Sequence, residues 1–207
     1  MQKMHYVWIL ALLCSCEKAP QDTAAMNSVK AQEAEDARFA EASGQKQQKI
    51  KKKPILHTVQ RSHPFSSASE QDYFRLTLRG DSVTTGQIEF TITTAQGHRI
   101  FQEVFSAADL EASLVNEMEK PTASASEREA YILRRMDEFV EAQDFLRPAI
   151  PSNSPVTTTF VSEDVWKRIQ TNPQAIGFRY LLGKEDGHLI VYDPAQKKAI
   201  RYNGTGG

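Results

Sequence analysis

Alternating apolar and polar residues predict three consecutive β-strands in the first half of the chain. In the stretch 73–79, the side chains of Phe74, Leu76 and Leu78 share one side, and polar residues occupy most positions between them. This period of two is typical of a half-buried strand. The stretch 87–94 repeats the pattern, and 98–105 repeats it less regularly. Short glycine-containing turns separate these stretches, and they indicate an antiparallel meander.

A second meander is predicted near the C-terminal end of the sequence. The stretch 176–182 alternates, and 188–192 and 198–202 follow it after turn-forming residues. The glycine-rich residues 203–207 are expected to fray.

Helical spacing predicts two to three amphipathic helices between the two meanders. Ser106 and Ser126 are expected to lie at the start of the first two, and Ser162 caps a shorter third one. The second helix carries its apolar stripe on Ile132, Leu133, Met136, Phe139 and Val140, and the third carries Val165, Trp166 and Ile169. The proline-containing stretch 145–155 is expected to be a loop, and 156–161 a short strand.

The expected fold class is therefore α+β, with two antiparallel β meanders of about three strands each and the helices between them. The stretch 55–71 shows no clear period and is interpreted as a transitional segment with loop histidines at His57 and His63. The domain organisation predicted is a signal peptide over 1–15, a lipid anchor and polar flexible tether over 16–54, and a single α+β domain over 55–207.

The start of the chain suggests export and anchoring. Residues 7–13 contain no polar side chain, and as a helix they would span about 10 Å, a third of a bilayer core. A run of this length suits the apolar region of a signal peptide. It ends in Leu13-Cys14-Ser15-Cys16, where Ser15 supplies the small residue that signal cleavage needs.

This motif resembles the lipobox of bacterial lipoproteins. The resemblance implies that the Cys16 thiol receives diacylglycerol, that the chain is cut before Cys16, and that the new amine is acylated, for example with palmitate. Glu17 in place of Asp then favours the outer over the inner membrane. Two alternatives remain open: an ordinary signal peptide in which Cys16 has no role, and a buried N-terminal helix.

The tether is predicted from composition. Residues 17–54 are rich in Ala, Gln, Glu and Lys, and they hold too little apolar surface to offset the entropy of ordering. A basic cluster closes this stretch, formed by Lys46, Lys49, Lys51, Lys52 and Lys53 before Pro54. It could attract anionic lipid or cell-wall polymer, or it could be a solvated linker end.

Charge and cysteine usage narrow the possible functions. The 207 residues carry a net charge of −1, which argues against a nucleic-acid partner. Both cysteines lie within the first 16 residues. Cleavage before Cys16 would remove Cys14, and diacylglycerol on the Cys16 thiol would leave no free thiol for catalysis, for zinc or for a disulfide.

No catalytic motif, cofactor site or metal site is predicted, because the usual phosphate-binding, dinucleotide, serine-hydrolase and zinc-protease signatures are missing from the sequence. Tyr180, Tyr192 and Tyr202 fall on three adjacent predicted strands, where they form either an exposed binding face or ordinary cross-strand pairs. The outer face of the second helix is expected to be rich in carboxylates, with Asp137, Glu138, Glu141 and Asp144. They could serve acid–base or metal chemistry, or they could be solvated surface.

The segment from Tyr131 to Tyr202 also resembles a set of small lipoproteins of Bacteroidota. The resemblance is carried by Tyr131-Ile132, Asp137, Phe139, Phe145-Leu146, Pro148-Ala149-Ile150, Trp166, Ile169, Phe178, Tyr180-Leu181 and Gly183-Lys184-Glu185. It implies no activity.

The sequence therefore favours a non-enzymatic module that is held to the envelope membrane through lipid on Cys16 and that binds an envelope protein or polymer. Two alternatives stay open. One is a small periplasmic inhibitor or chaperone-like factor, and the other is an enzyme whose site is assembled from scattered acids and from histidines such as His98 and His188.

Overall fold

The computed structural model describes residues 52–183 and 185–205. The predicted signal peptide, Cys16 and most of the predicted tether lie outside the described residues. The strands are β1 (Ile55–Pro64), β2 (Gln71–Arg79), β3 (Gln87–Thr93), β4 (Arg99–Ser106), β5 (Phe145–Leu146), β6 (Gly177–Leu182), β7 (Asp186–Asp193) and β8 (Lys198–Thr205). The helices are α2 (Ala107–Glu111), α3 (Ala125–Asp137) and α4 (Glu163–Gln170), with the short 3-10 turns η1 (Ala112–Asn116) and η2 (Ala142–Asp144).

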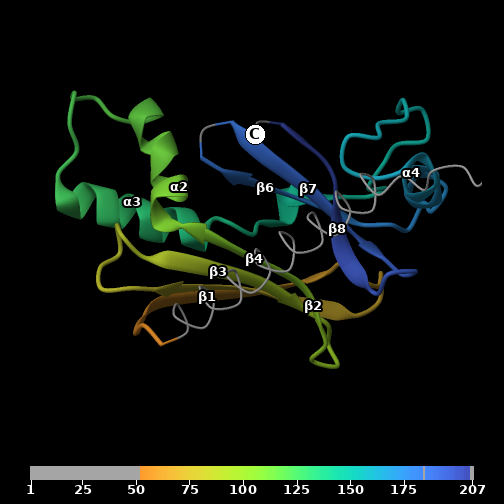
Figure 1. The fold of residues 1–207 in the computed structure, drawn as a ribbon, viewed down its shortest axis with the longest axis horizontal. Coiled ribbons are helices and arrows are strands. Elements are labelled where there is room, and N and C mark those ends of the chain that lie inside the picture. The colour runs from red at the N-terminus through yellow and green to blue at the C-terminus, as the bar shows by residue number, and fades with distance from the viewer. Residues whose placement is uncertain (1–51, 184, 206–207) are drawn as a thin grey trace, which may run out of the picture. The chain divides into compact units, whose positions relative to one another are not determined.

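The strands form two antiparallel sheets, each in chain order (Figure 1). Sheet A contains β1 to β4, and sheet B contains β5 to β8. The predicted α+β class is confirmed, whereas the prediction of about three strands per meander is wrong because each sheet has four. The additional strands are β1 and β5.

The sequence pattern did not predict β1 or β5, and in each case there is a physical reason. In β1, His57 pairs with Leu78 and Arg61 pairs with Phe74, so polar side chains take positions on the apolar side of sheet A. This strand lies at the edge of the sheet, where long polar side chains can reach water. β5 has two residues within a proline-containing segment, too few to show any period.

Two further boundaries differ from the sequence predictions. No strand forms over 156–161, which runs as an irregular segment. The prediction that residues 203–207 fray is wrong for 203–205, because Asn203, Gly204 and Thr205 pair with β7.

The apolar faces of the two sheets pack against each other. Phe74 and Phe90 of sheet A lie 5.1 and 6.1 Å from Phe178 of sheet B, measured between ring centroids. All three side chains are fully buried. Tilted and edge-on rings at these separations are the favourable geometry for aromatic pairs. We call the side of sheet B that faces sheet A its core face.

The opposite side of sheet B, its back face, is covered by α4 and by the loop before it. A second apolar cluster forms there from Ala149, Ile150, Trp166, Ile169, Val191 and Tyr202. The Tyr202 hydroxyl donates to the Ala149 carbonyl at 2.7 Å. Gln170 of α4 donates to the carbonyls of Pro151 and Ser154 at 3.0 and 2.9 Å. These bonds fix the loop on the sheet.

α2 and α3 lie at the opposite end of the sheets from α4 (Figure 1). Ser106 and Ser124 begin them with capping boxes, in which each serine hydroxyl accepts from the backbone three residues on. The cap of α3 is thus Ser124 and not the predicted Ser126. Ile132 and Met136 bury the inner side of α3 in the main core. No helix among the described residues has the length and apolarity needed to cross a bilayer.

A buried carboxylate ties α4 to the end of β7. Asp193 is 1% exposed, and it accepts from Arg168 Nη2 at 2.8 Å, from the Ala195 backbone at 3.1 Å and from Gln196 Nε2 at 2.9 Å. Burial alone would raise the pKa of this carboxyl. The hydrogen bonds from Arg168, Ala195 and Gln196 outweigh burial and lower the pKa below its ordinary value.

We expect Asp193→Asn to lower the free energy of unfolding by about 1.5–3 kcal/mol at pH 7, because a buried charge-assisted network loses its acceptor. The folded-state pKa of Asp193 is depressed, so its contribution is fully present above the ordinary value of 3.8 and is lost as the pH falls through the folded-state pKa. Urea unfolding followed by circular dichroism between pH 2.5 and 7 measures this. The difference between wild type and variant should be constant near neutrality and shrink below pH 3.8.

The matched control is Asp164→Asn, an exposed acid in the first turn of the same helix. It should change the free energy of unfolding by less than about 1 kcal/mol. A wild-type to Asp193→Asn difference that stays constant down to pH 2.5 would contradict the assignment.

Candidate functional site

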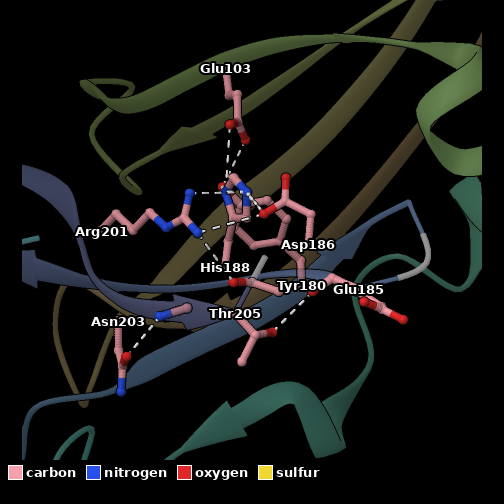
Figure 2. Close-up of polar contacts among 10 residues, drawn as sticks. Glu103, Tyr180, Glu185, Asp186, His188, Arg201, Asn203 and Thr205 are labelled. Atoms are coloured by element: carbon pink, nitrogen blue, oxygen red, sulfur yellow. Dashed lines mark hydrogen bonds and ion pairs between the residues drawn. The ribbon is translucent and has the colours of Figure 1, made fainter. Parts of the chain in front are cut away.

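A cluster of five polar side chains lies between β4 of sheet A and sheet B (Figure 2). Its members are Glu103, Tyr180, Asp186, His188 and Arg201. Strand register explains how they meet. Tyr180 and His188 pair directly across β6 and β7, and Glu103 pairs with the core residue Phe90 in sheet A. Glu103 therefore points from sheet A toward sheet B.

One side of the His188 ring is linked to sheet A through a tyrosine. The Tyr180 hydroxyl donates to Glu103 Oε2 at 2.7 Å, and His188 Nδ1 lies 3.0 Å from the same hydroxyl oxygen. The Tyr180 proton is directed to Glu103, so the hydroxyl oxygen can accept from Nδ1–H of His188. Glu103 Oε1 lies 3.6 Å from Nδ1.

The other side of the His188 ring faces a cation and an anion. Arg201 Nη1 lies 3.2 Å from His188 Nε2, and Asp186 Oδ1 lies 3.1 Å from the same nitrogen. A guanidinium can only donate, so the contact with Arg201 requires Nε2 to accept. Asp186 Oδ1 is buried and has no hydrogen-bond partner among the described atoms. Only a protonated His188 could hold hydrogens on both ring nitrogens and serve both Asp186 and Tyr180.

Burial and the charge of Glu103 keep the Tyr180 hydroxyl protonated. Burial raises the pKa of the Tyr180 hydroxyl, and the neighbouring Glu103 carboxylate raises it further. The hydroxyl therefore stays protonated and remains a donor across the neutral and mildly alkaline range.

A glycine makes room for the Arg201 side chain. Gly204 pairs with His188 in the β7–β8 register. A Cβ at position 204 would lie 2.5 Å from Arg201 Nη2 and would collide with the Gly187 carbonyl. Arg201 also stacks on the Phe160 ring, with the guanidinium carbon 4.4 Å from the ring centroid.

The polar cluster links sheet A to sheet B, and it does not present the His188 ring as a base that a substrate could reach. His188 is 6% exposed, and both of its ring nitrogens face polar neighbours. Solvent reaches the outer part of the cluster, where the side chains of Asp186 and Arg201 are 40% and 28% exposed. A ligand at this position would meet Asp186, Arg201 and Phe160.

The structure does not bring the three predicted tyrosines onto one exposed face. Tyr180 and Tyr202 are 4% and 2% exposed, and they lie in the two different apolar clusters. Tyr192 packs, partly buried, at the main core. The β7–β8 register pairs Tyr192 with Ala199, and Tyr202 lies three residues further along β8, so its side chain points to the back face. Cys16 lies outside the described residues.

The predicted histidines and acids are also dispersed. His98 is exposed in the turn between β3 and β4 and makes no polar side-chain contact with the cluster in the described part of the chain. His63 stacks on Phe145 at 3.5 Å between ring centroids. His57 Nε2 lies 3.7 Å from Asp137 Oδ1. Within the described ranges no group of three or more His, Cys, Asp or Glu side chains could hold a metal ion.

Three of the four predicted helix acids, Glu138, Glu141 and Asp144, line a neighbouring hollow. A hollow of about 610 Å³ lies between the end of α3, η2 and strands β6 and β7. Its lining includes Arg135, Glu141, Asp144, Arg179 and Leu181. Burial raises the pKa of the Asp144 carboxyl, although the backbone of Glu141 donates to it at 3.1 Å. This hollow combines both charges with an apolar side chain and so suits binding more than a defined reaction.

Sequence reasoning missed Glu103, Asp186 and Arg201. Glu103 interrupts the apolar side of an irregular strand, and this interruption is the signal that could have marked it. The sequence offers no such signal for Arg201, because its direction depends on the register of β8.

Comparisons of the chain with known proteins found no relative. No family model, no curated protein and no solved structure matches the chain.

We expect Tyr180→Phe to lower the free energy of unfolding by about 1–3 kcal/mol, because removal of the hydroxyl leaves Glu103 and His188 without their shared partner. Chemical unfolding at pH 7 measures the change. Tyr192→Phe is the matched control in the same sheet, since no hydrogen bond from its hydroxyl is present among the described contacts, and it should change stability by less than about 0.5 kcal/mol. Equal effects of the two substitutions would show that the Glu103–Tyr180–His188 connection contributes nothing.

Proposed function

We propose that the protein is a lipid-anchored binding module of the bacterial cell envelope. The observation that carries the proposal is the motif Leu13-Cys14-Ser15-Cys16 at the end of a seven-residue apolar run, residues 7–13. A diacylated cysteine would hold the chain at a membrane surface without any spanning helix, since two acyl chains give stable attachment.

The folded part supports binding more than catalysis. His188 is nearly buried, and its ring nitrogens face Tyr180, Asp186 and Arg201 instead of an open cavity. A general base has to reach the proton that it removes from a substrate. The described domain instead offers open surfaces and hollows of mixed polarity, such as the one beside Asp144.

The anchor is tested with Cys16→Ala. In bacterial cells fed an alkyne-labelled fatty acid, the wild-type chain should take up label and sediment with membranes. Cys16→Ala should lose essentially all label and appear in the soluble envelope fraction, because the thiol that accepts diacylglycerol is gone.

Cys14→Ala is the matched control, because Cys14 would be removed with the signal peptide. It should leave labelling and membrane association unchanged. Undiminished label in Cys16→Ala would overturn the anchoring proposal.

A further inference from the structure

One side of sheet A is not covered by any other element of the described residues, and we call this side the outer face. The other side of this sheet packs on sheet B, α2 and α3, all of which contribute to the main core. The register places polar side chains of all four strands in rows across the outer face. One row consists of Gln60, Arg75, Thr91 and Gln102, each directly paired with the next.

Two more rows flank the first. Ser62, Tyr73, Thr93 and Arg99 form one, and Thr58, Thr77, Glu89 and Val104 form the other. Paired strands lie about 4.8 Å apart, so the rows present hydrogen-bonding groups at a regular spacing. Tyr73 keeps 40% of its surface exposed, and Arg75 and Arg99 are also exposed.

The central row is held in place by its own hydrogen bonds. Arg75 donates from Nε and Nη2 to Gln60 Oε1 at 2.9 and 2.6 Å. This contact holds the guanidinium flat on the sheet and leaves its remaining N–H groups and the Gln60 amide as donors. Beside them lies a hollow of about 300 Å³, lined by Gln60, Tyr73, Arg75, Thr91, Thr93 and Gly97.

The charge of the outer face favours an acidic ligand. Arg75, Arg79 and Arg99 lie on it, and Glu89 is the one acid in the paired rows. The Glu89 carboxylate is already engaged, because Gln102 donates to it at 2.6 Å. Glu70 lies nearby, in the loop before β2, and accepts from Gln96 at 3.0 Å. The Arg99 side chain makes no hydrogen bond or ion pair among the described residues.

The composition of the face distinguishes between classes of ligand. A protein partner needs an apolar, desolvated centre, and a lipid surface needs apolar side chains to insert. Among the row residues only Tyr73 and Val104 offer apolar surface. Hydroxyls, amides and guanidinium groups in a shallow hollow match the hydroxyls and carboxylates of a sugar chain, and an aromatic ring can cover an apolar sugar face.

We propose that the outer face of sheet A binds an acidic polysaccharide, with Arg75 and Arg99 on its acidic groups and Tyr73 against a sugar ring. This inference rests on the proposed binding function and names the chemical class of the polymer.

The test uses the full chain in detergent micelles and three soluble polymers: polygalacturonate, dextran sulfate and neutral dextran. Affinity electrophoresis should show retardation by an acidic polymer and not by dextran. The double variant Arg75→Gln/Arg99→Gln should weaken binding at least about tenfold, since two charge-assisted contacts are lost. Tyr73→Ala should weaken it by a smaller factor.

Lys120→Gln/Arg134→Gln is the control, because it removes the same two charges from exposed side chains on and beside α3. It should keep binding within about twofold of the wild type. Equal loss in both double variants would indicate non-specific attraction and overturn the proposal, as would binding to neither acidic polymer. Stronger binding to phosphatidylglycerol vesicles than to phosphatidylcholine vesicles, lost in Arg75→Gln/Arg99→Gln, would overturn it in favour of a lipid surface. Fatty-acid labelling at Cys16 is independent of this face, so a labelled chain that binds no acidic polymer would refute this inference alone.

Discussion

The apolar faces of the two sheets are buried against each other, with Phe74 and Phe90 of sheet A on Phe178 of sheet B. This burial decides which surfaces of the domain remain available for binding. Sheet B is covered twice, by sheet A on its core face and by α4 with its loop on the back face. Within residues 52–183 and 185–205, sheet A is covered on one side alone. The side chains on its uncovered side are therefore free of packing requirements, and most of them are polar.

The same burial explains the polar cluster around His188. A polar group that is taken out of water without a partner destabilises the fold by several times the net gain of a typical hydrogen bond. Glu103, Tyr180 and His188 offset this cost by bonding to one another across the sheets. The pairing is incomplete at Asp186 and Arg201: their side chains reach solvent in part, but the buried atoms Asp186 Oδ1 and Arg201 Nε lack hydrogen-bond partners among the described atoms.

The sequence predicts those elements whose environment is simple. β2 and β3 face water on one side and the core on the other, so their alternation is visible from Phe74 and Ile88 onward. β1 is hidden because His57 and Arg61 occupy inward positions at a sheet edge, where they reach Asp137 at the end of α3. The three-tyrosine hypothesis depended on the pairing of β7 with β8. Turn geometry sets that pairing, and composition does not reveal it.

A shallow polar face makes only modest contacts with a ligand, because water competes for every exposed hydrogen bond. A membrane anchor changes the consequence of such weak contacts. A module held near a polymer-rich surface experiences a high effective concentration of that polymer, and several weak sites on one chain or on neighbouring chains then act together. Lipid on Cys16 and a row of guanidinium, amide and hydroxyl groups on sheet A would therefore be complementary, since the first provides proximity and the second provides chemical selectivity. Neither proposed feature would specify a partner by itself, because the motif at Cys16 would determine only where the chain is held and the rows on sheet A would determine only which chemistry is recognised.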